Sequence, residues 1–314
     1  MKILVTGGAG FIGSHVVDRL VAEGHQVRVL DDLSTGRLEN LAGVRDRIEF
    51  VQGDIRERNA VTKACQGVEA IIHEAAWRSV PKSMADPYGY VEVNVLATAG
   101  LLEAAAKAKV KRFVFVSSSS VYGETTKVPM REDDLTAPVS PYAASKLAGE
   151  LLCGLFSRSF GLETVSVRYF NVFGPRQSLE NEYAVVVPKF VMCLLRRESP
   201  PVYGDGKQSR DFTYIDNVAE ATILASQRPK VNGEVLNVAL GEEHSVLELL
   251  EELNRILGLS VKPAFQPPRP GDVLRTFADA SRAKRVLNWT GRVNFSEGLK
   301  RTAEWFKANP PKPT

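Results

Sequence analysis

A glycine-rich turn near the start of the chain constrains the possible fold more than any other feature. The run Thr6-Gly7-Gly8-Ala9-Gly10-Phe11-Ile12-Gly13 separates an apolar segment, Lys2–Thr6, from an amphipathic segment, Phe11–Glu23. Because glycine has no Cβ atom, this spacing permits a tight strand-to-helix turn and close contact between helix and strand. The sequence therefore predicts that the chain opens with a strand and a helix of a parallel sheet.

Strand-like and helix-like segments alternate over the first half of the chain. Besides Lys2–Thr6, we predict strands at Gln26–Leu30, Ile48–Val51, Ala70–His73, Arg112–Ser117 and Leu162–Tyr169. Helices are predicted at Phe11–Glu23, Arg56–Cys65, Val91–Ala108 and Pro141–Phe160. This order is typical of a sheet covered by helices on both faces, so the predicted fold class is α/β, a Rossmann-type doubly wound parallel sheet.

The sequence after Asn171 is richer in turns. Further helices are predicted at Val185–Arg197, Asp216–Ser226, Asp279–Leu287 and Ser296–Ala308, a strand at Glu234–Ala239, and extended loops at Pro200–Arg210 and Pro263–Asp272. Ser245 and Glu248 predict a capping box that opens one more helix. We expect residues 1–172, with about 213–240, to form the sheet domain, and 173–212 with 241–314 to form a smaller lobe at its carboxyl edge.

Composition excludes several classes of function. The 314 residues include 40 basic and 37 acidic side chains, a net charge of +3, without a basic block that would suit nucleic acid. No apolar stretch is long enough to span a membrane, and Met1–Val5 is too short for the apolar core of a signal peptide. Three widely spaced cysteines indicate reduced thiols in a cytoplasmic protein, and four scattered histidines give no indication of a metal site.

The glycine turn and Asp31 together predict a dinucleotide site. The helix N-terminus offers N–H groups and a partial positive charge to a pyrophosphate. Asp31 ends the second predicted strand, 18 residues after Gly13, which suits a carboxylate that binds a ribose 2′-hydroxyl and repels a 2′-phosphate. NAD is therefore favoured over NADP, although Arg37 keeps NADP open. Asp54 and Ile55 are expected near the adenine; for Asp54 a plain turn role is an equal alternative.

Tyr142 and Lys146 predict proton-transfer chemistry. Residues four apart share a helix face, so both side chains can point at one ligand. A free phenol titrates near about 10, and a neighbouring ammonium favours its ionised form. Ser118 lies upstream at a predicted strand end, where its hydroxyl can share the proton of a substrate alcohol. The choice of Ser118 among the four serines 117–120 depends on the strand register.

These motifs together resemble the extended short-chain dehydrogenase/reductase family, and within it the nucleotide-sugar 4-epimerases. The resemblance covers almost the whole chain, and the combination is more specific than any single motif. Besides the glycine turn and the Tyr142/Lys146 pair, it rests on His-Glu-Ala-Ala (73–76), Asn94, Ser-Ser-Ser-Ser-Val-Tyr-Gly (117–123), Arg-Tyr-Phe-Asn-Val-Phe-Gly-Pro-Arg-Gln (168–177), Gly-Asp-Gly-Lys-Gln-Ser-Arg-Asp-Phe (204–212) and Arg-Pro-Gly-Asp-Val (269–273).

The resemblance implies a role for each matching position. Catalysis is expected from Ser118, Tyr142 and Lys146. NAD contacts are expected from Gly7, Gly10, Phe11, Ile12, Gly13, Asp31, Asp54, Ile55, Ala75, Ala76, Asn94, Tyr142, Lys146 and Tyr169. Substrate contacts are expected from Arg78, Ser118, Ser119, Tyr142, Asn171, Val185, Val186, Tyr203, Arg210, Arg269, Asp272 and Thr276. Within this second set, Asn171, Arg210 and Arg269 are expected at the diphosphate, Asp272 at the uridine ribose, and Tyr203 with the Val185–Val186 backbone around the uracil.

The resemblance also implies a reaction, the inversion of C4 of a UDP-hexose by way of a 4-keto sugar. Dehydration and decarboxylation are disfavoured, because Ser119 and Ser120 stand where the family's dehydratases and decarboxylases carry acidic residues. Thr276 leaves room for a 2-acetamido group, so we expect UDP-glucose and, beside it, UDP-GlcNAc. UDP-glucuronate remains an alternative, with Arg78 or Lys82 as a partner for its carboxylate.

Two further classes of function remain. A dinucleotide-sensing regulator would not need the Tyr142/Lys146 pair, whereas a nucleotide-sugar reductase would need added NAD(P)H. The family's dimers also imply an assembly, because Val91–Ala108 and Pro141–Phe160 carry apolar residues on more than one face. We expect these two helices to pair with a second copy as a four-helix bundle, giving a homodimer.

Overall fold

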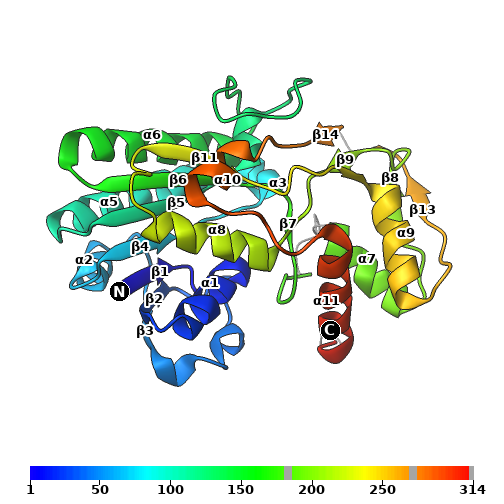
Figure 1. Cartoon of the computed structure of the whole chain (residues 1–314), viewed down its shortest axis with the longest axis horizontal. Helices are drawn as coiled ribbons and strands as arrows, with labels where there is room; N and C mark the ends of the chain where they lie inside the picture. Colours follow the sequence, from blue (N-terminus) through cyan, green and yellow to red (C-terminus); the bar gives the residue numbers. More distant parts are fainter. Residues whose placement is uncertain (180–185, 269–273, 311–314) are drawn as a thin grey trace.

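The main feature of the molecule is a seven-stranded parallel sheet with the strand order β11-β6-β5-β4-β1-β2-β3 (Figure 1). The computed structural model describes residues 1–179, 186–268 and 274–310. The sheet strands are β1 (Lys2–Thr6), β2 (Gln26–Asp31), β3 (Ile48–Gln52), β4 (Ala70–His73), β5 (Arg112–Ser118), β6 (Glu163–Tyr169) and β11 (Glu234–Val238). All neighbouring strands run parallel, which confirms the predicted fold class.

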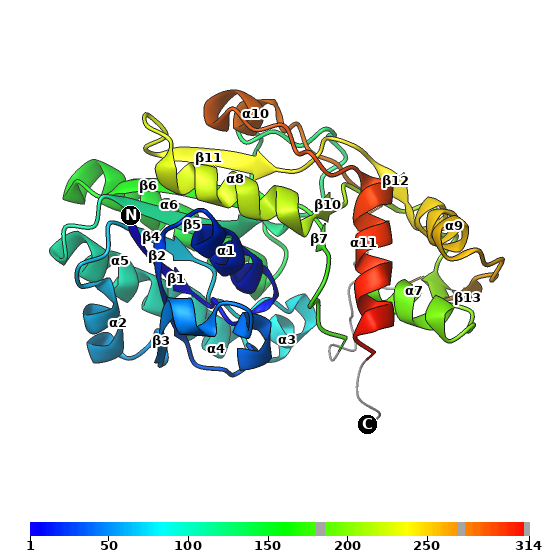
Figure 2. The same cartoon turned by 60° about the horizontal axis from the view of Figure 1, so that its bottom comes forward.

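Helices cover both faces of this sheet. Figure 2 shows α1 (Phe11–Ala22) and α8 (Ile215–Gln227) side by side on one face, near α10 (Ser281–Leu287). The other face carries α2 (Arg58–Cys65), α5 (Ala97–Lys107) and α6 (Pro141–Phe160). Alternate residues of β5 enter the two cores: Val114 and Val116 pack on the α1/α8 side, Phe113 and Phe115 on the α5/α6 side. A parallel strand buried on both faces needs such a continuous apolar run.

The predicted helix Val91–Ala108 is interrupted in the structure. Its span holds the last residue of α4 (Pro87–Val91), a π-helical stretch η3 (Glu92–Leu96) and α5. A short helix that the pattern did not predict, α3 (Val80–Ala85), precedes it. Ser79 and Asp86 cap the first turns of α3 and α4 by accepting hydrogen bonds from Lys82 N and Gly89 N.

A smaller lobe lies to the right of the sheet in Figure 1 and contains α7 (Val186–Leu195), α9 (Val246–Leu257) and α11 (Phe295–Ala308). Its core includes Phe11 and Phe173, which follow β1 and β6, so the lobe adjoins the carboxyl ends of the sheet strands. The predicted capping box opens α9: Ser245 Oγ accepts from Glu248 N at 3.1 Å, and Ser245 N donates to Glu248 Oε2 at 2.6 Å.

Short strands connect the lobe, and three of them (β8, β9 and β13) lie where the sequence predicted extended loops. They form pairs or triplets at the boundary with the sheet, in the combinations β10-β7, β12-β9-β14 and β13-β8. Their bounds are β7 (Val172–Phe173), β8 (Pro201–Tyr203), β9 (Ser209–Arg210), β10 (Thr213–Tyr214), β12 (His244–Ser245), β13 (Ala264–Gln266) and β14 (Arg275–Thr276). Each is two or three residues long, and it forms because segments distant in sequence meet there.

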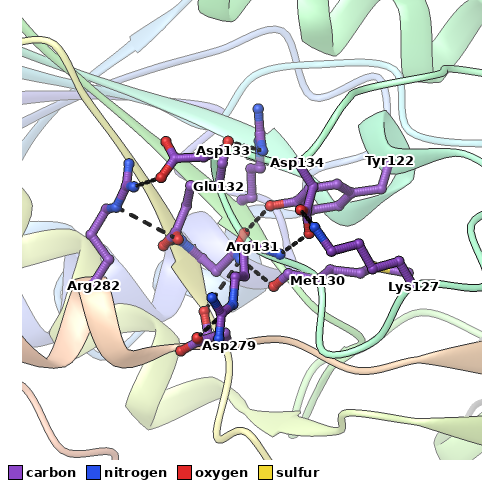
Figure 3. A network of polar contacts seen from close by, with 11 residues as sticks. Tyr122, Lys127, Met130, Arg131, Glu132, Asp133, Asp134, Asp279 and Arg282 are labelled. Carbon is purple, nitrogen blue, oxygen red and sulfur yellow. Dashed lines mark hydrogen bonds and ion pairs between the residues drawn. The ribbon is translucent and has the colours of Figure 1, made fainter.

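The segment between β5 and α6 is fixed by ionic contacts. It begins with the 3-10 turn η4 (Ser119–Tyr122) and crosses toward α10, where Figure 3 shows Arg282 reaching Glu132 and Asp133. Arg131 pairs with Asp279 at 3.3 Å in the same network. These contacts tie the segment to the start of α10.

Candidate functional site

A large cavity lies along the carboxyl ends of β1, β2 and β4. Its volume is about 1540 Å³, and it extends to α7 and α11 of the lobe. The predicted dinucleotide residues that line it are Gly7, Gly10, Phe11, Ile12, Gly13, Asp31, Asp54, Ile55, Ala75 and Ala76. The structure therefore brings together most of the residues predicted to contact NAD, from four separate segments of the chain.

The glycine turn has room for a phosphate group because it lacks side chains. Gly7 has φ +70°, and a Cβ there would lie 2.7 Å from Ala75 N. A Cβ on Gly13 would lie 2.2 Å from the Gly7 carbonyl oxygen. Gly10 is the N-cap of α1 and has no side chain to accept from the first N–H groups of that helix. These N–H groups belong to residues that line the cavity, and they suit the pyrophosphate of a dinucleotide.

Asp31 is held at the end of β2 by two backbone groups. Its Oδ2 accepts from Ala9 N and its Oδ1 from Leu33 N, both at 2.9 Å. Burial raises its pKa, and the two N–H groups oppose that shift. A carboxylate oxygen can accept more than one hydrogen bond, so a ribose hydroxyl can still bind at this cavity wall.

Asp54 forms a pair with Arg56 at the predicted adenine end. The Asp54 Oδ2 atom lies 2.5 Å from Arg56 Nη2, and this contact lowers the pKa of the carboxyl group. Arg56 also contacts Glu92 at 3.1 Å. Arg37 lines the cavity near Asp31 and engages in interactions of its own. The turn and the adenine roles of Asp54 are both compatible with this placement.

Asn94 lies behind the cavity wall. It is buried, its Oδ1 accepts from Trp77 N at 2.8 Å, and its Nδ2 donates to Trp77 O at 2.8 Å and to Ser145 Oγ at 3.0 Å. Ser145 in turn donates to the Tyr142 carbonyl. Asn94 therefore supports the wall segment that follows β4 and ties it to the start of α6. Its predicted contact with the cofactor stays a prediction.

The three predicted catalytic residues meet at the end of β5 and the start of α6. Ser140 caps α6 by accepting from Ala143 N at 3.1 Å, and Pro141 follows it, so Tyr142 lies in the first helical turn. The Ser118 hydroxyl, at the last residue of β5, interacts with the Tyr142 phenol. The Lys146 ammonium donates to Val116 O at 2.8 Å. They lie beside the cavity wall formed by Glu74 and Arg78, whose charges act on Lys146 and Tyr142 respectively.

Burial dominates the acid–base properties of this group. It raises the pKa of Tyr142, and the Ser118 hydroxyl and the Arg78 charge oppose that shift. It lowers the pKa of Lys146 to about 8, against the charges of Glu74 and Glu150. Among the protein's own groups, the contributions that favour the phenolate come from Ser118 and Arg78. The expected effect of Lys146 together with the positive nicotinamide stays a prediction.

Glu74 is a residue of this site that the sequence argument did not single out. It follows β4, and its carboxylate accepts from the Tyr169 hydroxyl at 2.9 Å. The same hydroxyl contacts Thr222 Oγ1 on α8 at 2.7 Å, so the predicted cofactor residue Tyr169 is fixed from two sides. Burial raises the pKa of Glu74 to about 7. A charged residue directly after a buried strand, at the carboxyl edge, was the available signal.

The predicted substrate residues lie around the short strands of the lobe boundary. Arg210 in β9 and Thr276 in β14 are direct partners in the parallel pairing. Asn171 follows β6, and its Nδ2 donates to Asp211 O at 3.3 Å. Tyr203 pairs with Gln266 through β8 and β13.

The remaining predicted substrate residues are more dispersed. Val186 opens α7, Ser119 opens η4, and Arg78 is exposed at the cavity wall. Val185, Arg269 and Asp272 lie outside the described residues.

Within residues 1–179, 186–268 and 274–310, no three His, Cys, Asp or Glu side chains gather as metal ligands would. Over the same ranges, no helix combines the length and the apolar character that crossing a bilayer requires.

Comparison with known proteins adds independent information. Residues 3–239 match the model of the NAD dependent epimerase/dehydratase family. A UDP-glucose 4-epimerase of Mycolicibacterium smegmatis is 41% identical over 311 residues, which cover 98% of this chain and 99% of that protein. The structure of a UDP-N-acetylglucosamine 4-epimerase from Methanobrevibacter ruminantium, in complex with UDP-N-acetylmuramic acid, is similar with a TM-score of 0.94, 38% identity and 98% coverage of both chains. A UDP-glucose 4-epimerase from Thermotoga maritima, with UDP-glucose, gives a TM-score of 0.93 at 38% identity over 99% of this chain and 100% of that one.

Proposed function

Because the chain belongs to the NAD-dependent epimerase/dehydratase family, we propose that it is an isomerase that inverts C4 of a UDP-hexose. The proposed substrates are UDP-glucose and UDP-galactose, with UDP-GlcNAc and UDP-GalNAc accepted beside them. The observation that carries this proposal is the meeting of Ser118, Tyr142 and Lys146 beside the glycine-turn cavity. A hydroxyl, a phenol and an ammonium can handle the proton that leaves when an alcohol is oxidised and returns when the resulting ketone is reduced, and NAD would supply the hydride acceptor.

The proposed roles follow from where the side chains lie. Tyr142 takes the proton from the sugar O4 and later returns it, while the Ser118 hydroxyl orients O4. Lys146, held by the Val116 carbonyl, stabilises the phenolate through its positive charge. When bound, NAD would supply hydride-transfer chemistry at C4. Asn171 and Arg210 keep the diphosphate anchored while the sugar turns over.

We also propose that the two parts of the chain bind different ligands. We assign NAD to residues 1–172 with about 213–240, where the glycine turn contacts the pyrophosphate and Asp31 the adenosine ribose. We assign the nucleotide sugar to 173–212 with 241–314. Asn94 contributes by supporting the Ala75–Trp77 wall, and Tyr169 by its fixed hydroxyl at the same edge.

The site favours epimerisation over related reactions of the family. Elimination of water across C5 and C6 needs acidic groups after the catalytic hydroxyl, and Ser119 and Ser120 occupy those positions. A UDP-glucuronate 4-epimerase is the second candidate, because Arg78 is exposed at the cavity wall and its charge acts on Tyr142. A guanidinium at that place suits a sugar carboxylate.

Proton NMR of the purified enzyme without added cofactor tests the proposal. Separate incubations with UDP-glucose and UDP-GlcNAc are expected to produce anomeric signals of the galacto products. If only UDP-glucuronate gives signals of its C4 epimer, the protein would be a UDP-glucuronate 4-epimerase instead. Turnover only after addition of NAD(P)H, with net consumption of it, would replace the isomerase by a reductase.

Substitution of the proposed base gives a sharper test. Tyr142→Phe removes the proton acceptor and is expected to lower kcat by about 100-fold or more. Tyr88→Phe, on the exposed surface of α4, is the matched control and should keep wild-type turnover. Near-normal turnover by Tyr142→Phe would show that another group acts as the base.

We also propose that two copies associate through the α5/α6 face in the cytoplasm. Exposed apolar side chains there include Leu96, Leu151, Leu155 and Phe160, which together form an outward surface on η3 and α6. Apolar groups gathered in this way are typical of an interaction surface. The three cysteines are free thiols, which supports a reducing compartment.

A further inference from the structure

Asp211 is a buried carboxylate between β9 and β10 that no role described so far requires. Its exposed fraction is 0%. Its Oδ1 accepts from Leu240 N at 3.1 Å, and its Oδ2 accepts from Gly241 N at 3.0 Å and from Ala278 N at 3.4 Å. Backbone groups from two distant segments therefore converge on one side chain.

Those two segments belong to different parts of the molecule. Leu240 and Gly241 follow β11, the edge strand of the large sheet. Ala278 follows β14, the strand that carries Thr276. Asp211 itself follows Arg210 on β9, which lies at the boundary between sheet and lobe (Figure 1). The carboxylate thus fastens the end of the sheet to two strands of the proposed substrate region.

The backbone of Asp211 extends the same connections. Its N–H donates to Thr276 O at 2.7 Å, and its carbonyl accepts from Asn171 Nδ2 at 3.3 Å. Three predicted substrate residues, Asn171, Arg210 and Thr276, are therefore bonded to Asp211 or adjacent to it. The side chain has no exposed surface with which to touch the substrate, so its influence on substrate passes through these neighbours.

Burying this carboxylate carries an energetic cost. Burial raises the pKa of Asp211, Glu242 adds a like charge, and the three N–H groups oppose the shift. A neutral apolar side chain would avoid the cost of the charge but would leave three buried N–H groups without an acceptor. The arrangement is therefore specific for a side chain that accepts several hydrogen bonds at once.

We propose that Asp211 is a positioning residue that holds Asn171, Arg210 and Thr276 in one substrate-binding arrangement against the end of β11. This inference rests on the proposed function, because it takes a UDP-sugar as the ligand of those three residues. It assigns Asp211 to nucleotide-sugar affinity and leaves proton transfer to Tyr142 and Ser118.

The test is Asp211→Asn, which keeps the shape of the side chain but places an NH₂ group against a backbone N–H. The KM for UDP-glucose, and the Kd for UDP measured by calorimetry, are expected to rise about 10-fold to 100-fold, as loss of hydrogen bonds to a charged group implies. The kcat value and the amount of NAD that copurifies should stay close to wild type. Asp205→Asn is the matched control, because this carboxylate accepts from Lys207 N on the surface of the preceding turn.

A second measurement uses the wild-type protein and does not depend on the folding of a variant. Hydrogen exchange of the Leu240 and Gly241 amides should slow when UDP binds, because both are bonded to Asp211. Unchanged exchange, or equal UDP affinity of Asp211→Asn and wild type, would overturn the proposal. A lower kcat at unchanged KM would also overturn it.

The failure of the proposed function has a different signature. Wild-type protein that neither binds UDP nor epimerises a UDP-sugar would refute that function and this inference together. Wild-type protein that does both, with an Asp211→Asn variant of equal affinity, would refute the positioning role alone.

Discussion

At the residue scale, the environment of each side chain decides its chemistry. Tyr142, Lys146 and Glu74 are ordinary titratable residues, yet burial moves all three pKa values in the direction that favours the neutral form. Glu74 opposes this shift for Lys146, because its negative charge favours the ammonium, and reinforces it for Tyr142, because it disfavours the phenolate. One carboxylate therefore acts on both partners of the proton-transfer pair.

The pH dependence of the reaction follows from these signs. Glu74→Gln removes the negative charge, so the pKa values of Tyr142 and Lys146 should both fall. Both limbs of the kcat/KM profile, which report the apparent pKa values of this coupled pair, should therefore move to lower pH. A pH profile of kcat/KM checks this, with Glu251→Gln on the exposed face of α9 as the control. A profile that keeps its position while its height drops would indicate a structural role for Glu74 only.

The spacing of residues along the chain was sufficient to predict some residues of the candidate site, but it was insufficient for others. Gly7, Gly13 and Asp31 lie within one strand–helix–strand unit, and Tyr142 and Lys146 lie within one helix. Their mutual placement is set by backbone geometry alone. The importance of Glu74 and Asp211 depends instead on partners about 30 to 95 positions away in the chain. No periodicity carries that information.

At the scale of elements, α6 is attached to the sheet by a buried ion pair. Glu150 on α6 bonds Arg168 on β6 at 2.7 and 2.9 Å and also accepts from Ser117 on β5. Arg168 in turn stacks over the Tyr122 ring at 4.7 Å. Because Glu150 lies one turn beyond Lys146, this contact fixes the helix where it carries the proposed catalytic groups.

Breaking that pair should be costly. Glu150→Gln leaves the Arg168 cation without its carboxylate in a site where both side chains are at most 5% exposed, and such losses cost about 3–5 kcal/mol. The melting temperature should fall clearly. Glu163 lies on the same strand as Arg168, pairs with Arg112 on β5 and is 52% exposed. Glu163→Gln should change the melting temperature little. Equal effects of the two substitutions would contradict the importance of burial here.

Element boundaries show where sequence patterns are reliable. The predicted bounds of β1, β4 and α6 agree with the structure, because turns and a Ser-Pro cap mark them. The two short helices α3 and α4 were missed, although Ser79 and Asp86 provided capping signals, because five or six residues give no periodic pattern. The short strands β8, β9 and β13 were missed because their pairing partners lie far away in the sequence.

At the scale of the whole molecule, the outer side of α6 determines the proposed association. Leu151 is 67% and Leu155 43% exposed, and both lie on the side of the helix away from Glu150 and Cys153. Leu151→Glu is expected to convert a dimer to a monomer, measured by light scattering after size-exclusion chromatography. Leu135→Glu is the control, since Leu135 is 89% exposed in the segment before α6. A wild-type protein that is already monomeric would refute the association.

The same helix therefore has two ends of different character. Tyr142 lies in its first turn, and Leu155 lies 13 residues further on, about 20 Å along a continuous helix. If the outer face of α6 pairs with a second copy, the contact would hold α6 in place, and with it the Tyr142 phenol. Protein concentration then becomes a variable of catalysis: dilution that separates the copies should lower the activity of each one, with the reacting groups themselves unchanged.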